Sequence, residues 1–262
     1  MNSDWVNRYS EGLAGVKKAG QYALNFFDTD LVVETKNDLS PVTIADRGAE
    51  QTLRQHLISR FPDDGFLGEE LGNSPGSSGY RWIIDPIDGT RSFIRGIPIW
   101  GTLVGLEYHG ELIAGMCYLP VWDQCYHALQ GQGAFRNDRP IRVSSTNHIN
   151  KAILSYSSID YFHSVGKENV FLNLVHNCER SRSYADFYGF VLVAQGCVDL
   201  MLDFGVHSWD VAALKVIVEE AGGKMTAWNN SQSIDQPDVI ATNGLLHEQA
   251  LKYLADGMGT TS

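Results

Sequence analysis

The sequence predicts an α/β (α+β) fold, and three features of its 262 residues support this class. Apolar residues recur at helical spacing near the N-terminus. Between residues 101 and 143 the pattern changes to short strand-like runs separated by turns, and beyond residue 147 strands and helices alternate. A chain of this length can form one large domain or two intimately packed domains with a substantial core.

Two helices and then two buried strands are predicted for the first part of the chain. Helical spacing of apolar residues predicts a first helix over residues 4–27 and a second around 49–57, ended by Phe61-Pro62. Phe66-Leu67 and Arg81–Ile84 are apolar enough to be buried strands. The two are therefore expected to be neighbouring strands.

A run of strands follows. It comprises Thr102–Glu107, Leu112–Tyr118, Cys125–Leu129 and Ile141–Val143, with turns at His109-Gly110 and Asn137-Asp138. The polar stretch Ser145-Thr146-Asn147 predicts a boundary between an N-terminal half, residues 1–145, and a C-terminal half, residues 146–262.

Helices and strands are expected to alternate in the C-terminal half, as in layered α/β proteins. The predicted strands are Ala152–Ser157, Val198–Asp203 and Val239–Ala241. The predicted helices are Val170–Cys178, Phe187–Gln195, Asp210–Ala221 and a last one around Glu248–Leu254.

The most informative stretch is Asp85-Pro86-Ile87-Asp88-Gly89-Thr90, which follows a buried strand. Asp85 and Asp88 are close enough in sequence to face one point. Two such carboxylates repel each other unless a cation lies between them, and hard oxygen ligands suit Mg²⁺. Gly89 permits a close backbone approach, and Thr90 can open a helix whose free N–H groups attract phosphate. The alternative is an ordinary strand-to-helix turn in which Asp88 only caps the helix.

Three other acidic positions extend this pattern. Glu69 follows a predicted strand, Asp210 precedes a long apolar helix, and Asp46 lies where a loop enters a helix. Each has an ordinary interpretation, because glutamate pairs are usually solvated and an aspartate before a helix is usually a cap. Together they give a candidate set of oxygen ligands: Glu69, Asp85, Asp88 and Asp210, with Asp46 upstream.

These motifs, taken in order, make the sequence resemble the inositol monophosphatase superfamily of Mg²⁺-dependent phosphatases. The resemblance rests on Gly68-Glu69-Glu70, on Trp82–Thr90, and on Trp209-Asp210-Val211-Ala212 followed by Glu220-Ala221-Gly222-Gly223. It covers nearly the whole chain. It implies a layered αβαβα sandwich of the inositol monophosphatase / sugar phosphatase type, a phosphomonoesterase activity, and a homodimer, which is usual among the relatives.

The same resemblance implies two or three Mg²⁺ ions and assigns their ligands. Glu69, Asp85 and the carbonyl of Ile87 would bind the first ion. Asp85, Asp88 and Asp210 would bind the second, with Asp85 bridging. A third, weaker ion would use Glu69. Two metal ions can together activate a water and stabilise the leaving oxygen of a phosphate ester.

Catalytic and phosphate-binding roles are also implied by the resemblance. Glu69, Thr90 and Asp46 would be catalytic, with Thr90, backed by Asp46, orienting and deprotonating the attacking water. Backbone N–H groups of Gly89 and Thr90 would hold the phosphate.

The segment Ser183–Phe190 bears on the substrate, since it resembles the Gly-Asp-Cys-Tyr-x-Tyr signature of histidinol-phosphate phosphatases within the superfamily. Ala185 and Phe187 depart from that signature. Histidinol phosphate carries an ammonium and an imidazole, so its pocket needs negative acceptors, and Asp186 and Asp203 could supply them. The alternative interpretation is that Asp186 caps the helix that begins at Phe187.

L-histidinol phosphate is therefore the predicted substrate, a small phosphorylated metabolite. An inositol-1-phosphate phosphatase, or a phosphatase of another sugar or nucleotide phosphate, is the alternative within the enzyme class. A non-catalytic metal- or phosphate-binding relative is the alternative outside it. Loss of one of the candidate ligands would have favoured that last interpretation.

Composition constrains partners and location. A net charge of −11 argues against a nucleic-acid surface, which would require a basic stripe. The four cysteines show no Cys-x-x-Cys pairing, so they are expected to be reduced thiols of a cytoplasmic protein. We expect no signal peptide and no membrane association, because the N-terminus lacks a basic, apolar leader and no segment is long and apolar enough to span a bilayer.

Overall fold

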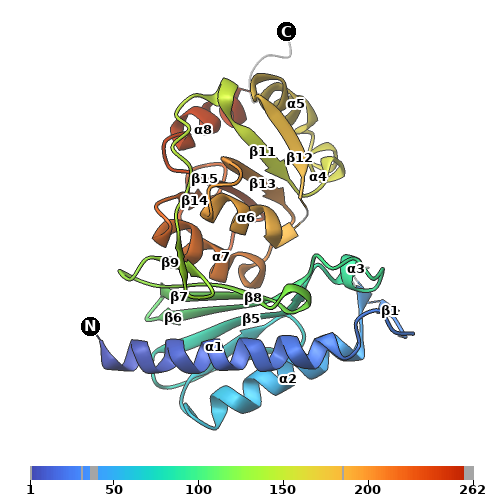
Figure 1. Cartoon of the computed structure of the whole chain (residues 1–262), viewed down its shortest axis with the longest axis vertical. Coiled ribbons are helices and arrows are strands. Elements are labelled where there is room, and N and C mark those ends of the chain that lie inside the picture. The colour runs from blue at the N-terminus through green and yellow to red at the C-terminus, as the bar shows by residue number, and fades with distance from the viewer. Residues whose placement is uncertain (1, 31, 36–40, 185, 257–262) are drawn as a thin grey trace.

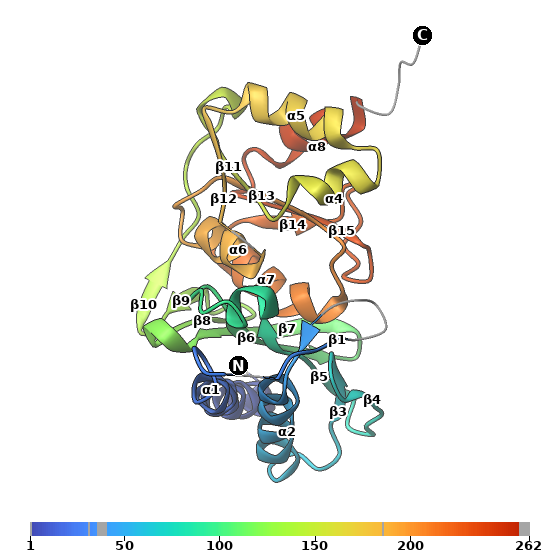
Figure 2. The ribbon, with the colours of Figure 1, turned by 90° about the vertical axis from the view of Figure 1, so that its right-hand side faces the viewer.

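The computed structural model describes residues 2–30, 32–35, 41–184 and 186–256, which form five alternating layers of helices and strands (Figures 1 and 2). The first layer contains α1 (Ser3–Leu24) and α2 (Ile44–Ile58), which lie side by side beneath a large sheet. Between this sheet and a smaller one lie α6 (Asp186–Ala194) and α7 (Ser208–Glu220). The last layer contains α4 (Ile159–Ser164), α5 (Glu168–Asn177) and α8 (His247–Asp256). The predicted αβαβα sandwich is confirmed.

The large sheet has the strand order β10-β9-β8-β7-β6-β5-β3-β4. Neighbouring strands are antiparallel except β3 and β5, which run parallel. Its strands are β3 (Gly65–Gly68), β4 (Gly72–Ser74), β5 (Tyr80–Asp88), β6 (Gly101–Tyr108), β7 (Glu111–Leu119), β8 (Gln124–Leu129), β9 (Ala134–Arg136) and β10 (Arg139–Ile141).

The smaller sheet has the order β12-β11-β13-β15-β14 and is also mixed. Its strands are β11 (Ile153–Tyr156), β12 (Arg180–Ser183), β13 (Leu200–Phe204), β14 (Lys224–Thr226) and β15 (Asp238–Thr242). A separate pair, β1 (Glu34–Thr35) with β2 (Pro41–Val42), precedes α2. Short elements complete the chain: α3 (Thr90–Phe93) and two 3₁₀ turns, Pro120–Trp122 and Ile149–Lys151.

Three apolar cores hold the layers together. The first joins α1 and α2 to the large sheet, with Trp82 and Trp100 fully buried. The second lies between the sheets and around α6 and α7, and the third joins the smaller sheet to α4, α5 and α8. Burial of apolar surface on both faces of each sheet explains why the central strands are nearly continuous apolar runs.

Two glycines let α7 lie directly on the large sheet. Gly105 of β6 and Gly115 of β7 are cross-strand partners. A Cβ atom at Gly105 would lie 2.8 Å from the Cβ of Ala212, and one at Gly115 would lie 2.1 Å from the carbonyl oxygen of Ala213. The helix backbone therefore packs against the sheet at a distance that only glycine permits.

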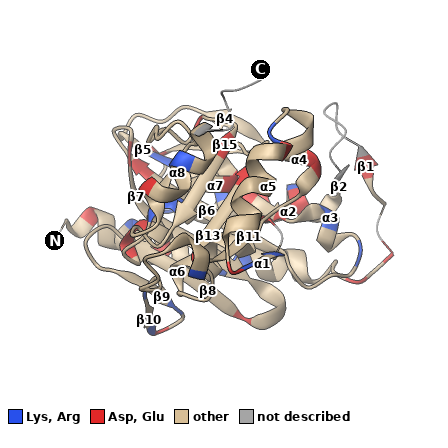
Figure 3. Ribbon diagram, turned by 90° about the horizontal axis from the view of Figure 1, so that it is seen from above, with Lys and Arg blue, Asp and Glu red and all other residues tan. Residues whose placement is uncertain are grey.

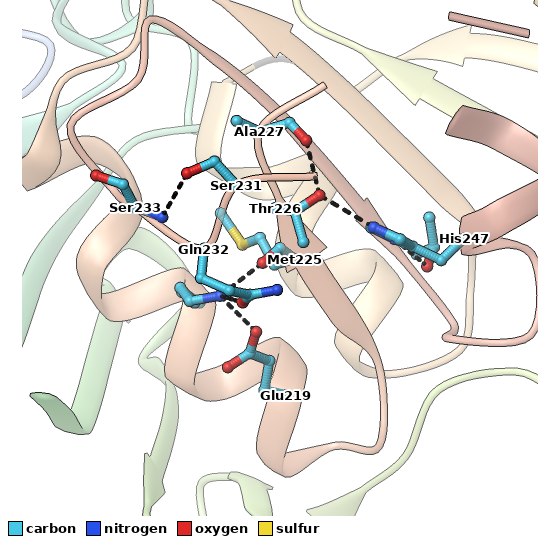
Figure 4. Close-up of polar contacts among 10 residues, drawn as sticks. Glu219, Met225, Thr226, Ala227, Ser231, Gln232, Ser233 and His247 are labelled. Carbon is cyan, nitrogen blue, oxygen red and sulfur yellow. Dashed lines mark hydrogen bonds and ion pairs between the residues drawn. The ribbon is translucent and has the colours of Figure 1, made fainter. Parts of the chain in front are cut away.

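The second half of α7 is fixed by Lys215, whose side chain is nearly buried. Its ammonium donates to Glu219 at 2.5 Å, to the carbonyl of Met225 at 2.6 Å and to Gln232 at 2.9 Å (Figure 4). Beside it, Thr226 contacts buried His247 of α8 at 3.0 Å. The Lys215 contacts attach α7 to β14 and to the loop that follows it, and the Thr226 contact joins β14 to α8.

Several predicted elements need correction. The first helix ends at Leu24, three residues early, and the predicted strand 141–143 lies instead at Arg139–Ile141, paired with β9. β5 does not end at Ile84 but continues through Pro86 to Asp88. The sequence also missed α4 and the strands β4, β9, β12 and β14.

The large sheet ends at residue 141 and the smaller sheet begins at residue 153, although the division into halves 1–145 and 146–262 stays a prediction. No helix within the described ranges is long and apolar enough to cross a membrane. Figure 3 shows Asp and Glu on helices and strands throughout the molecule, so the site described below accounts for only part of the acidic charge.

Candidate functional site

Parallel pairing of β3 and β5 brings the first two candidate ligands together. Gly68 is registered with Ile84, and the N–H of Glu69 donates to the carbonyl of Ile84 at 3.1 Å. Because the parallel register places Gly68 beside Ile84, Glu69, just after the end of β3, lies beside Asp85 of β5. The predicted proximity of these two carboxylates is therefore a consequence of strand pairing.

An irregularity in β5 orients the motif that contains Asp85 and Asp88. The register against β6 shifts between these two residues, and Pro86 lies inside the shift. Proline has no N–H for a ladder hydrogen bond and is tolerated at such bulges. The chain then turns at Gly89, whose φ of 85° favours glycine. Gly89 is the N-cap of α3 and makes no side-chain cap, so the interpretation of Asp88 as a helix cap is wrong.

Thr90 connects the motif to α2. Its hydroxyl donates to the carbonyl of Ile87 at 2.9 Å and lies 3.4 Å from the carboxylate of Asp46. Asp46 is buried and accepts hydrogen bonds from the N–H and hydroxyl of Thr43, which forms the N-terminal capping box of α2. Burial raises the pKa of Asp46, partly offset by the Thr43 hydrogen bonds. Asp46 thus lies behind Thr90 and does not line the cavity.

α7 contributes Asp210 from the opposite layer. Asp210 is in the first turn of the helix, where its carboxylate accepts the N–H of His207 at 2.7 Å. An acidic residue in this position is also stabilised by the helix dipole. Asp210 therefore both caps α7 and, as predicted, lies among the candidate metal ligands.

One cavity of about 180 Å³ joins these residues. All the predicted site residues except Asp46 line it: Glu69, Asp85, Ile87, Asp88, Gly89, Thr90, Asp186, Asp203 and Asp210. Asp186 is the first residue of α6, within its first turn. Ala185, which departs from the signature, lies outside the described residues. Asp203 is at the end of β13 and accepts hydrogen bonds from the Ser157 hydroxyl and, at 2.7 Å, from the N–H of Phe204.

The lining also includes residues that sequence reasoning missed: Arg91, Tyr161 and Phe204–Val206. Arg91 directly follows Thr90, so its proximity to the motif was a usable signal. Tyr161 belongs to α4, which was not predicted, and no sequence pattern connects it to the site.

Burial and mutual repulsion dominate the electrostatics of the cavity. Burial raises the pKa of Asp85 well above its usual value, and the charges of Glu69, Asp88 and Asp210 raise it further. The pKa of Asp88 is likewise raised by burial and then by Asp186 and Asp210. These carboxylates are therefore close enough to oppose each other's ionisation.

Asp203 and Asp186 belong to the same network. Burial raises the pKa of Asp203 to about 7, and the charges of Asp186 and Asp210 add to the rise, while its hydrogen bonds lower it. Burial also raises the pKa of Asp186, whereas Arg91 lowers it. A cation entering the cavity would stabilise the charged forms of these groups.

The donor set fits Mg²⁺. Six carboxylates of the described residues line the cavity, against one positively charged side chain, Arg91. Oxygen donors are the ligands that Mg²⁺ prefers. Within the described ranges no group of three His, Cys, Asp or Glu side chains is already arranged as a metal site. Asp85 instead accepts the N–H of Ile87, and Asp210 that of His207, so ion binding is expected to reorient these carboxylates.

Comparisons with known proteins agree with this geometry. The model of the inositol monophosphatase family matches residues 7–258. A histidinol-phosphatase of Mycobacterium tuberculosis is 41% identical over 89% of this chain and 92% of that protein. An inositol-1-monophosphatase of Caulobacter vibrioides is 33% identical over 86% of this chain and 91% of that protein. The crystal structure of the extragenic suppressor protein SuhB of Bartonella henselae superimposes with a TM-score of 0.88 at 29% identity, covering 95% of this chain and 98% of that one.

The fold and the acidic cavity are those of a phosphoric monoester hydrolase. The chain belongs to the inositol monophosphatase family, whose members are generally Mg²⁺-dependent.

Proposed function

We propose that this protein hydrolyses L-histidinol phosphate to L-histidinol and inorganic phosphate, with Mg²⁺ held by Glu69, Asp85, Asp88, Asp210 and the carbonyl of Ile87. The observation that carries the substrate is the pair Asp186 and Asp203, two carboxylates that line the cavity in addition to the proposed metal ligands. They provide acceptors for the ammonium or imidazole of the substrate.

When bound, two or three Mg²⁺ ions would supply Lewis acidity to the phosphate and an acidic water. The water oxygen forms a new bond to phosphorus, and the bond from phosphorus to the substrate oxygen breaks. That oxygen leaves with a proton as the hydroxyl of histidinol. No side chain needs to form a covalent intermediate, and the backbone N–H groups of Gly89 and Thr90 are proposed to bind the phosphate.

Thr90 and Asp46 are proposed to orient the water and accept its proton. The Thr90 hydroxyl has one proton, now donated to the carbonyl of Ile87 at 2.9 Å. If that carbonyl binds an ion, the hydroxyl proton can turn to Asp46, 3.4 Å away, and the hydroxyl oxygen can accept from water. The raised pKa of Asp46 makes it a stronger base than an exposed aspartate.

Asp186 and Asp203 are proposed to hold the cationic end of the substrate. Tyr161 lines the same cavity, so this end would also meet an aromatic ring. A neutral polyol phosphate would gain less from these carboxylates. The similarity to a histidinol-phosphatase, at 41% identity against 33% for the inositol-1-monophosphatase, supports the same choice.

A panel of phosphate esters, assayed for phosphate release with and without Mg²⁺, tests the proposal. Histidinol phosphate should have the highest kcat/KM, above inositol 1-phosphate, glycerol phosphate and a nucleotide. A preference for inositol 1-phosphate would favour the second candidate, which rests on the relatives of that name. No release from any ester would favour a non-catalytic relative.

The variant Asp186→Asn tests substrate recognition directly. Removing one partner of a desolvated charge pair commonly costs ~2–5 kcal/mol, which is tens to thousands of fold in kcat/KM for histidinol phosphate. Glycerol phosphate, which lacks the cation, is the control substrate and should be affected much less.

A purely structural role for Asp186 would have a different signature. Loss of a favourable charge from the first turn of α6 lowers stability by ~0.3–1 kcal/mol and does not discriminate between substrates. A lowered melting temperature with an unchanged ratio of the two kcat/KM values would contradict the proposed contact with the substrate.

A cytoplasmic homodimer is part of the proposal. All four cysteines are free of disulfides and Cys117 and Cys125 are buried, which supports a reducing compartment. The dimer rests on the family resemblance alone. Sedimentation analysis of the purified protein measures the oligomeric state, and a monomer at micromolar concentration would contradict it.

A further inference from the structure

Glu50 of α2 is a fully buried carboxylate outside the cavity. One of its oxygens accepts hydrogen bonds from the backbone N–H groups of Glu70 at 2.8 Å and Leu71 at 3.2 Å. The other accepts from Nε of Arg54 at 2.8 Å. Glu50 therefore binds the turn that follows β3, the turn that carries Glu69.

Arg54, one helical turn further along α2, extends this contact. Its Nη2 lies 2.7 Å from Glu50 and donates to the carbonyl of Gly72 at 2.5 Å, while Nη1 donates to Ser74 at 3.2 Å. The pair thus holds both the turn after Glu69 and strand β4. Glu50 and Arg54 are four residues apart and therefore lie on the same face of α2.

The end of β3 packs directly on the Glu50 carboxylate. A Cβ atom at Gly68 would lie 1.9 Å from Oε1 of Glu50, so only glycine fits there. On the other side, the N–H of Glu69 is bound by the carbonyl of Ile84 in β5 at 3.1 Å. The backbone of Glu69 is therefore held between β5 and Glu50.

A buried ion pair is an expensive way to fill this space, because both ions lose their hydration. Apolar side chains of similar size would avoid that loss. They could not accept hydrogen bonds from Glu70 and Leu71, whose N–H groups would then lose their partners. The pair thus maintains one particular conformation of the turn.

We propose that Glu50, together with Arg54, is a positioning residue for the metal site, since it holds the turn that directs the Glu69 carboxylate into the cavity beside Asp85. The inference rests on the proposed function, in which Glu69 binds Mg²⁺. Glu50 acts only through this turn and touches neither ion nor substrate. Losing groups that support a metal ligand typically lowers metal affinity ~10–100-fold.

Isothermal titration of the purified protein with MgCl₂ tests this without relying on activity. The double variant Glu50→Met/Arg54→Met replaces the pair by apolar side chains and leaves no unpaired buried charge. It should still fold, with a melting temperature lowered by the unpaired N–H groups of Glu70 and Leu71, and should bind Mg²⁺ ~10–100-fold more weakly at a temperature where it is folded. Glu50→Gln keeps one acceptor oxygen and should show a smaller loss of affinity.

Asp64→Asn is the matched control. The side chain of Asp64 is also fully buried, and its carboxylate accepts two hydrogen bonds of 2.9 Å from Arg8. Asp64 lies just before the start of β3, whereas Glu69 lies just after its end. Its loss should lower the melting temperature and leave the affinity for Mg²⁺ unchanged. Equal weakening of Mg²⁺ binding in Asp64→Asn would overturn the inference, because general destabilisation would then explain the effect.

Unchanged Mg²⁺ affinity in the folded double variant would also overturn the inference. If the double variant does not fold, an unchanged affinity of Glu50→Gln for Mg²⁺ would overturn the inference instead. A parent protein that binds no Mg²⁺ would instead overturn the proposed function itself, so the two failures are distinguishable.

Discussion

Replacing Gly115 by alanine should displace α7 and thereby damage the site from a distance. The added Cβ would lie 2.1 Å from the carbonyl oxygen of Ala213 and 3.1 Å from its Cα. Real Cβ atoms essentially never approach another heavy atom closer than 3.0 Å. The distance of 2.1 Å to the carbonyl oxygen must therefore increase by at least about 0.9 Å. The obstructing atoms belong to helix backbone and cannot rotate away, so α7 itself must move.

The expected loss of stability follows from this overpacking. Inserting a methyl group into a well-packed core typically costs ~1–3 kcal/mol. For a chain of this size each kcal/mol lowers the melting temperature by ~2–4 °C, so a decrease of roughly 2–12 °C is expected. Thermal unfolding followed by circular dichroism measures this.

Activity should fall by more than stability. Asp210 is on the same helix, less than one turn before Ala213, and moves with it. A misplacement of ~1 Å at a site commonly lowers the rate by ~10²-fold. We therefore expect kcat/KM, measured at a temperature where the variant is fully folded, to fall by about that factor.

Gly12→Ala is the control, because Gly12 belongs to α1, which packs on the other face of the large sheet against Met116 of β7. Its Cβ would lie 2.7 Å from the terminal methyl of Met116, a flexible side chain that can move aside, and 3.0 Å from Trp82. The substitution also favours the helix by ~0.5–1 kcal/mol. Parental activity of Gly115→Ala, or a large loss in Gly12→Ala as well, would refute the argument that close contact with α7 positions Asp210.

Three further predictions concern the ions and the carboxylates. EDTA should abolish activity and Mg²⁺ restore it, because the clustered carboxylates cannot receive a phosphate dianion without cations; full turnover in metal-free buffer would contradict the site. Asp85→Asn should lose more activity than Glu70→Gln, since Asp85 is proposed to touch two ions; equal losses in folded proteins would mean that the glutamate pair is wrongly assigned. The rise in melting temperature caused by saturating Mg²⁺ should grow as the pH increases from about 5 to about 8, since protons leave these carboxyls when the ion binds. Without Mg²⁺, burial holds the pKa of Asp203 at about 7 and raises those of Asp85 and Asp88, so the stability they contribute is present below their unfolded pKa and is lost as pH rises through the folded pKa. Burial lowers the pKa of His247 to about 4, so the contribution of His247 to stability increases with pH. This contribution is the same with and without Mg²⁺ and does not affect the rise in melting temperature caused by the ion. A rise that is independent of pH would contradict the release of protons on Mg²⁺ binding.

Central elements could be predicted, whereas edge elements could not. β5, β6 and β7 are buried on both faces and appear in the sequence as apolar runs. β4 is exposed throughout and β12 reads Arg-Ser-Arg-Ser, because an edge strand buries little and needs no apolar pattern. The short helix α4 was missed for a similar reason, since it covers the outer face with few buried residues.

The end of the strand that carries Asp85 was misplaced for a different reason. Proline is normally excluded from a central strand, so the predicted strand stops at Ile84, before Pro86. The register shift between Asp85 and Asp88 accommodates it, and the strand continues to Asp88. Such a shift depends on pairing with β6, which a local pattern does not reveal.

The sequence by itself determined the chemistry and the family of this protein. The spacing of Asp85 and Asp88 and the ordered motifs with Glu69 and Asp210 were sufficient, because each motif is a short run of residues that can be identified without knowing the fold. Only the tertiary structure decided that Asp186 and Asp203 share a cavity with them, that Tyr161 lines it, that Glu50 binds the turn after Glu69, and that Gly115 lies against the backbone of α7. These relations join residues from different layers, and their distances follow from how the sheets and helices pack, which no local pattern records.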